Sequence, residues 1–214
     1  MPIANINEAD LWYEVMGQGE PLLLHHGYTA SRENWWPVAE ILKQHYQVVL
    51  IECRGCGESE HTAGGYNFEQ YALDAVELMR QLGHERFSFA GHSMGGKAAM
   101  RLVMDRPDLV ARLTVVDIAP RAYSDRVRVE FAAMNALDLA AVTSRKDAEA
   151  KLSAHVSEWG MRQFILTNLG QDAEGRWGWT VNREALTNSL PEILGDPLAP
   201  GEVWNGPTRF LRGG

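Results

Sequence analysis

The sequence predicts an α/β fold in which a mostly parallel sheet carries helices on both faces. Candidate strands and helices alternate from residue 21 to residue 120, and such alternation builds βαβ units with parallel strands. The candidate strands are continuous apolar runs, for example residues 22–24 (LLL) and 47–51 (QVVLI). A continuous run indicates that both faces of the strand are buried, which requires helices on each side of the sheet.

The elements can be placed in order along the chain. Asn67, with Gln70 three residues later, has the pattern of a helix N-cap, and Gly83 has the pattern of a helix end. The expected order is a β-hairpin at 3–15, a strand at 22–24, a helix at 35–46, a strand at 47–51, a helix after 67, a strand at 86–90, a helix at 96–104 and a strand at 113–117.

Residues 121–200 differ in composition from the first part of the chain. Helical patterns dominate, and a tryptophan-rich stretch at 176–179 (RWGW) interrupts them. We expect this block to be a helical cap inserted into the core, and we expect residues 207–211 to return to the sheet. The predicted domains are a core at 1–120, a cap at 121–200 and a return to the core sheet at 201–214.

Composition narrows the possible functions. The chain has 214 residues, of which 45% are hydrophobic and 22% charged, and a net charge of −8, values that are ordinary for a soluble globular protein. The negative charge argues against nucleic acid as a partner, because phosphate binding needs a basic face. The first ten residues lack the features of a signal peptide, and no apolar run approaches the length of a bilayer span. We therefore expect a cytoplasmic protein with no nucleic-acid or membrane partner.

The strongest chemical signal is a G-x-S-x-G motif at residues 91–95 (GHSMG). The motif follows a predicted strand and precedes a predicted helix, which is the setting of a nucleophile elbow. At such a strained turn only glycine leaves room around the serine, whose hydroxyl then projects from the edge of the sheet. Ser93 is therefore the candidate nucleophile for acyl transfer.

A second motif, residues 25–28 (HHGY), follows the strand at 22–24. A loop in this position can donate one backbone N–H to an oxyanion hole, and the residue after the nucleophile donates the other. We expect Tyr28 and Met94 to be these two donors. The alternative is an ordinary turn between a strand and a helix.

Three residues near these motifs are candidates for substrate binding: His26, His92 and Trp35. Tryptophans near an oxyanion loop often line an apolar acyl pocket, and they equally often anchor a core. His92 flanks the nucleophile, although its side chain is expected to point away from Ser93.

Four segments make the chain resemble the α/β-hydrolase superfamily. They are His26-Gly27, residues 54–59 (RGCGES), residues 91–95 and residues 116–120 (VDIAP). The last segment, with residues 177–182 (WGWTVN) and 210–214 (FLRGG), is similar to a narrower branch of small bacterial acyl esterases and their mitochondrial relatives. The resemblance implies a serine esterase with a nucleophile elbow, an oxyanion hole and a cap domain. One departure is Glu52, which stands where an aspartate is usual and is expected to affect only a structural contact.

The same resemblance bears on the rest of the triad. In the narrower branch the aspartate of the D-I-A-P segment can serve as the acid, which implies that role for Asp117. A structural aspartate that bonds the next loop is the alternative. The triad histidine of this fold follows the last strand, but the last histidine of this chain is His155, inside the expected cap. We therefore expect the final strand, the final helix and the triad histidine to be absent.

Cys53 and Cys56 form a C-R-G-C pair. A redox pair or half of a zinc site is one interpretation, but a zinc site would need two more ligands at suitable spacing and the chain has no second pair. We favour two unrelated cysteines in one loop. No metal or organic cofactor is implied.

The expected activity is hydrolysis of a small carboxylic ester or thioester through an acyl-enzyme. A different reaction on the same fold stays possible, since fold does not fix reaction. A second alternative is a non-catalytic member that binds a small molecule, or an inactive fragment, because a serine without a base is a weak nucleophile.

Overall fold

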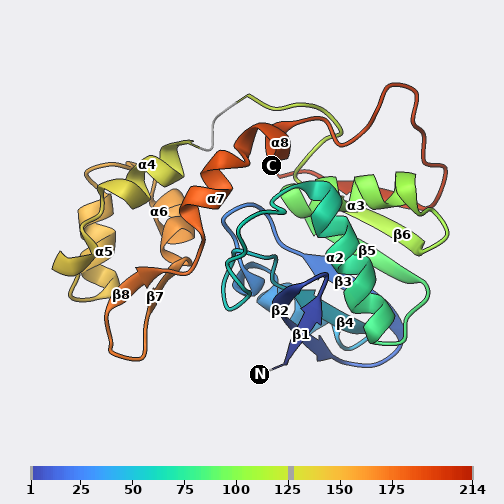
Figure 1. Cartoon of the computed structure of the whole chain (residues 1–214), viewed down its shortest axis with the longest axis horizontal. Coiled ribbons are helices and arrows are strands. Elements are labelled where there is room, and N and C mark those ends of the chain that lie inside the picture. The colour runs from blue at the N-terminus through green and yellow to red at the C-terminus, as the bar shows by residue number, and fades with distance from the viewer. Residues whose placement is uncertain (1, 125–127, 214) are drawn as a thin grey trace.

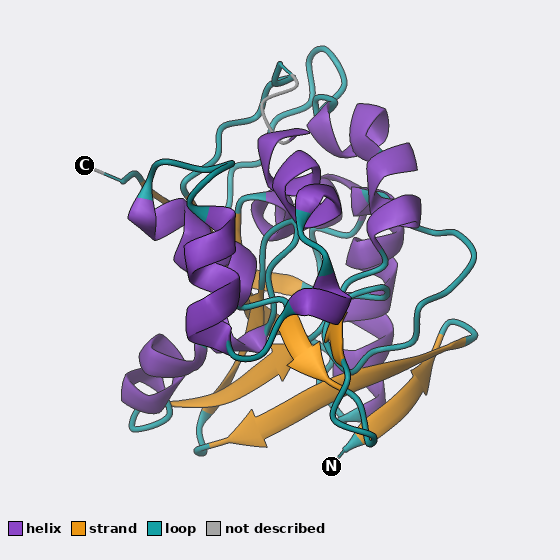
Figure 2. Ribbon diagram, turned by 90° about the vertical axis from the view of Figure 1, so that its left-hand side faces the viewer, coloured by secondary structure: helices purple, strands orange, loops and turns teal. Residues whose placement is uncertain are grey.

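The computed structural model describes residues 2–124 and 128–213. Its centre is a seven-stranded sheet in the order β1-β2-β4-β3-β5-β6-β9, with helices layered around it (Figures 1 and 2). The strands of this sheet are β1 (Ile3–Ile6), β2 (Ala9–Met16), β3 (Glu20–His25), β4 (Tyr46–Ile51), β5 (Phe87–His92), β6 (Val110–Val116) and β9 (Thr208–Leu211).

The sheet is mostly parallel, which confirms the fold class. β3 pairs in parallel with β4 and β5, and β6 pairs in parallel with β5 and β9. The exception is β2, which runs antiparallel to β1 and β4. β1 and β2 form the predicted N-terminal hairpin, in which Ile3 lies opposite Trp12.

Helices cover both faces of the sheet because alternate residues of each strand point to opposite sides. Leu23 and Val49 belong to the core under α2 (Phe68–Gln81) and α3 (Met94–Asp105). Their neighbours Leu24 and Leu50 belong to a second core with Ala39 of α1 (Trp36–Leu42). The continuous apolar runs of the sequence are therefore explained by burial on two sides.

Two helix ends differ from the prediction. α1 ends at Leu42 rather than near Tyr46, because β4 already begins at Tyr46. α3 begins at Met94 rather than at Gly96, directly after the serine turn. The predicted N-cap of α2 is confirmed, since the Asn67 side chain accepts a hydrogen bond from the Gln70 N–H at 2.7 Å.

The chain between β6 and β9 lies beside the sheet and not within it (Figure 1). Trp177 and Trp179 pack against the same apolar cluster as Tyr28 and Met94, so this block rests on the loops around Ser93. Its elements are α4 (Arg128–Ala136), α5 (Arg145–Leu152), α6 (Trp159–Leu166), β7 (Leu169–Gln171), β8 (Trp177–Trp179), α7 (Arg183–Asn188) and α8 (Leu190–Leu194). The domain limits at 120 and 200 stay a prediction.

β9 returns to the sheet as predicted, with Thr208 opposite Leu113 and Leu211 opposite Val116. All four of its residues are exposed. Within the described ranges β9 is an edge strand, because it pairs with β6 alone. No helix in the described part of the chain is long and apolar enough to cross a membrane.

Candidate active site

Ser93 occupies a tight turn between the last residue of β5 and the first residue of α3. Its backbone has φ 51° and ψ −116°, a conformation that L-residues rarely adopt. The Ser93 N–H donates to the Val116 carbonyl at 2.9 Å, which ties the turn to the end of β6. A strained serine held between a strand and a helix has the geometry of a nucleophile elbow.

The glycines of the motif are required by close packing. A Cβ on Gly91 would lie 2.1 Å from the Gly95 carbonyl oxygen, and a Cβ on Gly95 would lie 2.5 Å from the His25 carbonyl oxygen. Both distances are shorter than any real contact. Any side chain at position 91 or 95 would therefore clash with the backbone. Glycine at these positions lets α3 begin directly against residues 25–26.

Gly95→Ala tests this packing. We expect the substitution to lower the free energy of unfolding by about 1–3 kcal/mol, because overpacking a filled site forces the backbone to shift. Gly64→Ala is the matched control, since a Cβ on Gly64 meets nothing within 4 Å. Urea unfolding measures both, and equal stability of the two variants would contradict the packing argument.

The loop at residues 25–28 lies directly beside the nucleophile. A Cβ on Gly27 would lie 3.2 Å from the Ser93 Cβ and 2.9 Å from the His92 Nδ1. Met94 is the first residue of α3, so its N–H has no acceptor within the helix. The Tyr28 hydroxyl donates to the Leu186 carbonyl at 2.7 Å, which joins this loop to α7. The two expected oxyanion donors thus come from segments that pack against Ser93.

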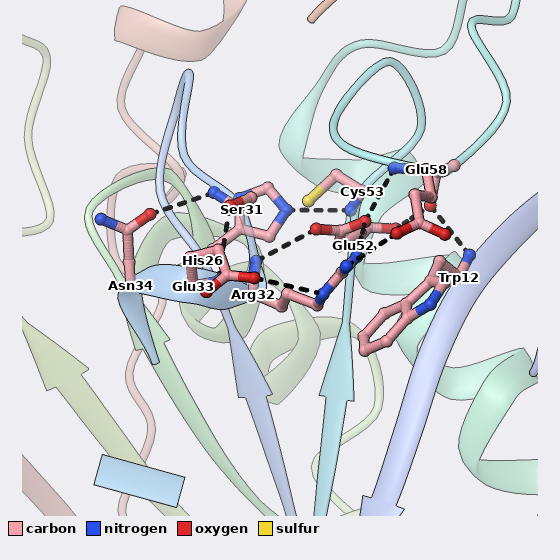
Figure 3. A network of polar contacts seen from close by, with 10 residues as sticks. Trp12, His26, Ser31, Arg32, Glu33, Asn34, Glu52, Cys53 and Glu58 are labelled. Carbon is pink, nitrogen blue, oxygen red and sulfur yellow. Dashed lines mark hydrogen bonds and ion pairs between the residues drawn. The ribbon is translucent and has the colours of Figure 1, made fainter. Parts of the chain in front are cut away.

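His26 has a structural position, which does not fit the predicted substrate contact (Figure 3). The side chain is fully buried, and its Nε2 accepts the Cys53 N–H at 3.0 Å. The Nδ1 must then carry the proton, which it donates to the Gly27 carbonyl at 2.8 Å. Burial lowers the pKa of His26 to about 3. Neutral His26 therefore holds the oxyanion loop against the loop that follows β4.

His25 is buried like His26, and burial lowers its pKa to about 4. The protein should therefore lose stability in acid. Below pH 6.5 the unfolded chain binds protons at His25 and His26 that the folded chain does not. The free energy of unfolding should therefore fall as the pH drops from 6.5 toward 4, by about 1.4 kcal/mol per pH unit for each histidine.

Urea unfolding at pH 7, 6 and 5 checks this slope. His26→Gln should reduce the slope by one proton, whereas His61→Gln, at an exposed position, should leave it unchanged. An unchanged slope in His26→Gln would show that the acid sensitivity has another origin.

Glu52 anchors the loop at residues 53–59 (Figure 3). Its side chain is 1% exposed and accepts hydrogen bonds from Arg32 Nη1 at 3.0 Å and from the Glu58 N–H at 2.9 Å. Desolvation raises the pKa of Glu52, and the Arg32 charge opposes that rise. The departure from aspartate thus falls on a structural contact.

Asp117 follows the last residue of β6 and also has a positive φ of 55°. Its N–H donates to the Leu211 carbonyl at 2.8 Å, and its Oδ1 accepts the Gly213 N–H at 3.2 Å. Burial lowers the pKa of His92, and the Asp117 charge acts in the opposite direction, so the two side chains are close enough to interact. Asp117 is exposed at the carboxyl edge of the sheet, the same edge as Ser93.

A cavity of about 390 Å³ opens beside Ser93. Its lining residues are Tyr28, Ser93, Met94, Lys97, Ile118, Arg121, Ala122, Tyr123, Ser124, Ile193 and Leu194. No histidine is among them. His155 is exposed after the end of α5, and His45 and His61 are exposed as well. The structure therefore brings Ser93 and the loop at residues 25–28 together, with Asp117 at the same edge of the sheet, and no histidine is among the described residues that line the cavity.

Trp35 does not line this cavity, and this differs from the prediction. It packs with Trp12 and Leu22 in the core beneath α1, on the opposite face of the sheet from α3. Sequence reasoning also missed Lys97 and Arg121, which do line the cavity. Lys97 had a usable signal, because residues four apart on a helix share a face and Lys97 is four residues after Ser93.

The cysteine pair lies in the interior of the protein. Cys53 and Cys56 are free thiols, both buried. Burial raises the pKa of both thiols, which disfavours the thiolate that redox or metal chemistry needs. No cluster of potential metal ligands occurs among the residues that the structure describes.

Comparison with known proteins supports the family. The model of a family described as alpha/beta hydrolase fold matches residues 20–158. The chain belongs to this α/β-hydrolase family. The structure of a marine microorganism esterase superposes on this α/β-hydrolase with a TM-score of 0.87 and 31% identity, over 94% of this chain and 80% of the other.

Curated relatives agree with the predicted resemblance to esterases. The sn-1-specific diacylglycerol lipase ABHD11 of Danio rerio is 36% identical over 215 residues, which cover 95% of this chain and 67% of the relative. Esterase YbfF of Escherichia coli is 32% identical over 195 residues, covering 91% of this chain and 74% of the relative. The α/β-hydrolase chain spans 63% to 67% of the length of its vertebrate relatives.

Proposed function

We propose that this chain is a serine hydrolase that cleaves small carboxylic esters or thioesters through an acyl-enzyme on Ser93. The observation that carries the proposal is the strained Ser93 backbone, at φ 51°, with the Gly27 loop against it. The relatives named esterase and lipase support the same chemistry. The identity of the acyl group is taken up below.

Each residue has a role in this proposal. The Ser93 Oγ attacks the carbonyl carbon, and the alcohol or thiol leaves with a proton to give an acyl-enzyme that water then hydrolyses. The N–H groups of Tyr28 and Met94 stabilise the oxyanion, and each such donor contributes about 3 kcal/mol to the transition state. Asp117 orients a histidine that takes the serine proton. No histidine is among the described residues that line the cavity at Ser93.

Hydrolysis of p-nitrophenyl butyrate by the protein and by Ser93→Ala tests the proposal. We expect turnover that depends on Ser93 and that increases when a base is supplied, as argued in the Discussion. Release of p-nitrophenol at the same rate by both proteins, with and without added base, would overturn the proposal.

A second candidate is a non-catalytic protein that binds a small molecule in the same cavity. The absence of a histidine from the residues that line the cavity favours it. A ligand that binds the folded state raises the melting temperature. A rise with butyrate esters, in the absence of any Ser93-dependent turnover, would select this candidate.

A further inference from the structure

The cavity beside Ser93 is positively charged, although the chain as a whole carries a net charge of −8. Two of the residues that line it are charged, and both are cations, Lys97 and Arg121. No acidic residue lines it among those that the structure describes. Because charge at a binding site acts at short range and in a partly desolvated space, the local sign matters more for a ligand than the net charge does.

Lys97 is buried beside the nucleophile, with 2% of the residue exposed. Its ammonium donates to the Ile193 carbonyl at 3.1 Å and to the Gly195 carbonyl, both at the C-terminal end of α8. These acceptors are neutral. No carboxylate of a described residue lies within ion-pair distance of Lys97, and the Asp196 charge acts on it only from farther away. A buried charge without a counter-ion costs free energy. Desolvation accordingly lowers the pKa of Lys97 to about 8, so the side chain is still charged at neutral pH.

The position of Lys97 on α3 places it near the Ser93 turn. Four residues correspond to about 6 Å along a helix axis. Helical side chains lean toward the N-terminus of the helix, and the N-terminus of α3 is the Ser93 turn. Lys97 and Ser93 both line the same cavity, about one helical turn apart.

Tyr123 connects the two cations. The Lys97 Nζ lies 5.1 Å from the centre of the Tyr123 ring, and the Arg121 Cζ lies 4.7 Å from it. The Tyr123 ring is fixed by its hydroxyl, which accepts the Ala119 N–H at 2.8 Å. Arg121 is exposed, and its guanidinium forms no ion pair within the described ranges. Arg121 thus presents hydrogen-bond donors at the opening of a cavity whose inner end holds Lys97.

We propose that this cavity selects esters that carry a carboxylate, which is bound by Lys97 and Arg121 while the ester carbonyl lies at Ser93. The inference rests on the proposed hydrolase function and adds the substrate class. A carboxylate provides the direct ion pair that Lys97 lacks, and hydrogen bonds between charged partners are stronger than neutral ones. The nearness of Lys97 to Ser93 restricts the spacer between ester and carboxylate to a short one.

Binding to the Ser93→Ala protein tests the inference without turnover. Isothermal titration calorimetry compares monomethyl glutarate, with the charge on the acyl side, and O-acetylglycolate, with the charge on the alcohol side, against neutral methyl butyrate. We expect at least one anionic ester to bind about tenfold more tightly than the neutral ester, and the better of the two identifies the charged side. Equal binding of all three would overturn the proposal.

Two variants assign the selectivity to the named cations. Lys97→Met keeps the stem and removes the charge, and Arg121→Met changes an exposed residue that folding does not need. Both variants are made in the Ser93→Ala protein. Each should remove most of the preference for binding the anionic ester over the neutral one. Lys43→Met is the matched control and should keep it, because Lys43 is a partly exposed lysine that pairs with Glu40 and does not line the cavity. An anionic preference that survives in both cavity variants would overturn the assignment.

The outcome is separable from the hydrolase proposal. Selective binding by Ser93→Ala without any Ser93-dependent turnover in the unmodified protein would keep the carboxylate site and reject the hydrolysis. Ser93-dependent turnover without selective binding would keep the hydrolysis and reject the carboxylate site.

Discussion

Imidazole added to the buffer should increase the Ser93-dependent hydrolysis of p-nitrophenyl butyrate by about 10²-fold or more. A general base in the transition state contributes about 10²–10⁴-fold, and loss of the triad histidine costs about 10⁶ in turnover. Among the residues that the structure describes, no histidine lines the cavity at Ser93. A soluble imidazole can enter such a site and accept the serine proton, while Asp117 stabilises the resulting imidazolium.

Ser93→Ala is the control, because imidazole also attacks p-nitrophenyl esters directly. The difference in rate between the two proteins at each imidazole concentration is the enzymatic part. A large Ser93-dependent rate that does not respond to imidazole would mean that one of the seven histidines already reaches Ser93. Histidine variants, beginning with His92 and His155, would then identify the base.

The sequence was sufficient for the features that depend on local pattern. Alternation of strands and helices predicted the parallel sheet, and the glycines around Ser93 predicted the elbow, because both are consequences of local sterics and of burial. Asn67 was predictable as an N-cap for the same reason, since its bond to the Gln70 N–H spans three residues.

Features that depend on side-chain direction or on distant segments were not predictable. His26 and Trp35 lie near the motifs in sequence, but one side chain points to Cys53 and the other packs beneath α1. The contact of Lys97 with α8 joins residues separated by 96 positions. No local pattern encodes such a contact, so the charged cavity became visible only in the folded chain.

A similar long-range contact gives the largest expected loss of stability. Asp74→Ala should lower the free energy of unfolding by about 3–5 kcal/mol, because it leaves the Arg54 charge buried without a partner. Asp74 accepts two hydrogen bonds from Arg54 at 2.8 Å each, and one each from Asn7 and Gln70 at 2.9 Å. The side chains of Arg54 and Asp74 are 7% and 2% exposed, so water cannot replace these bonds.

Urea unfolding measures the loss, and Asp105→Ala is the control. Asp105 pairs with Arg101 on α3, but its side chain is 54% exposed, so we expect a change below about 1 kcal/mol. The double variant Arg54→Met/Asp74→Ala should recover part of the loss, since it removes the unpaired charge as well. A double variant no more stable than Asp74→Ala would mean that the loss comes from the Asn7 and Gln70 bonds to Asp74 and not from the unpaired Arg54 charge. Because the Cys53 N–H in that loop donates to His26, weakening the loop should also displace residues 25–28 beside Ser93.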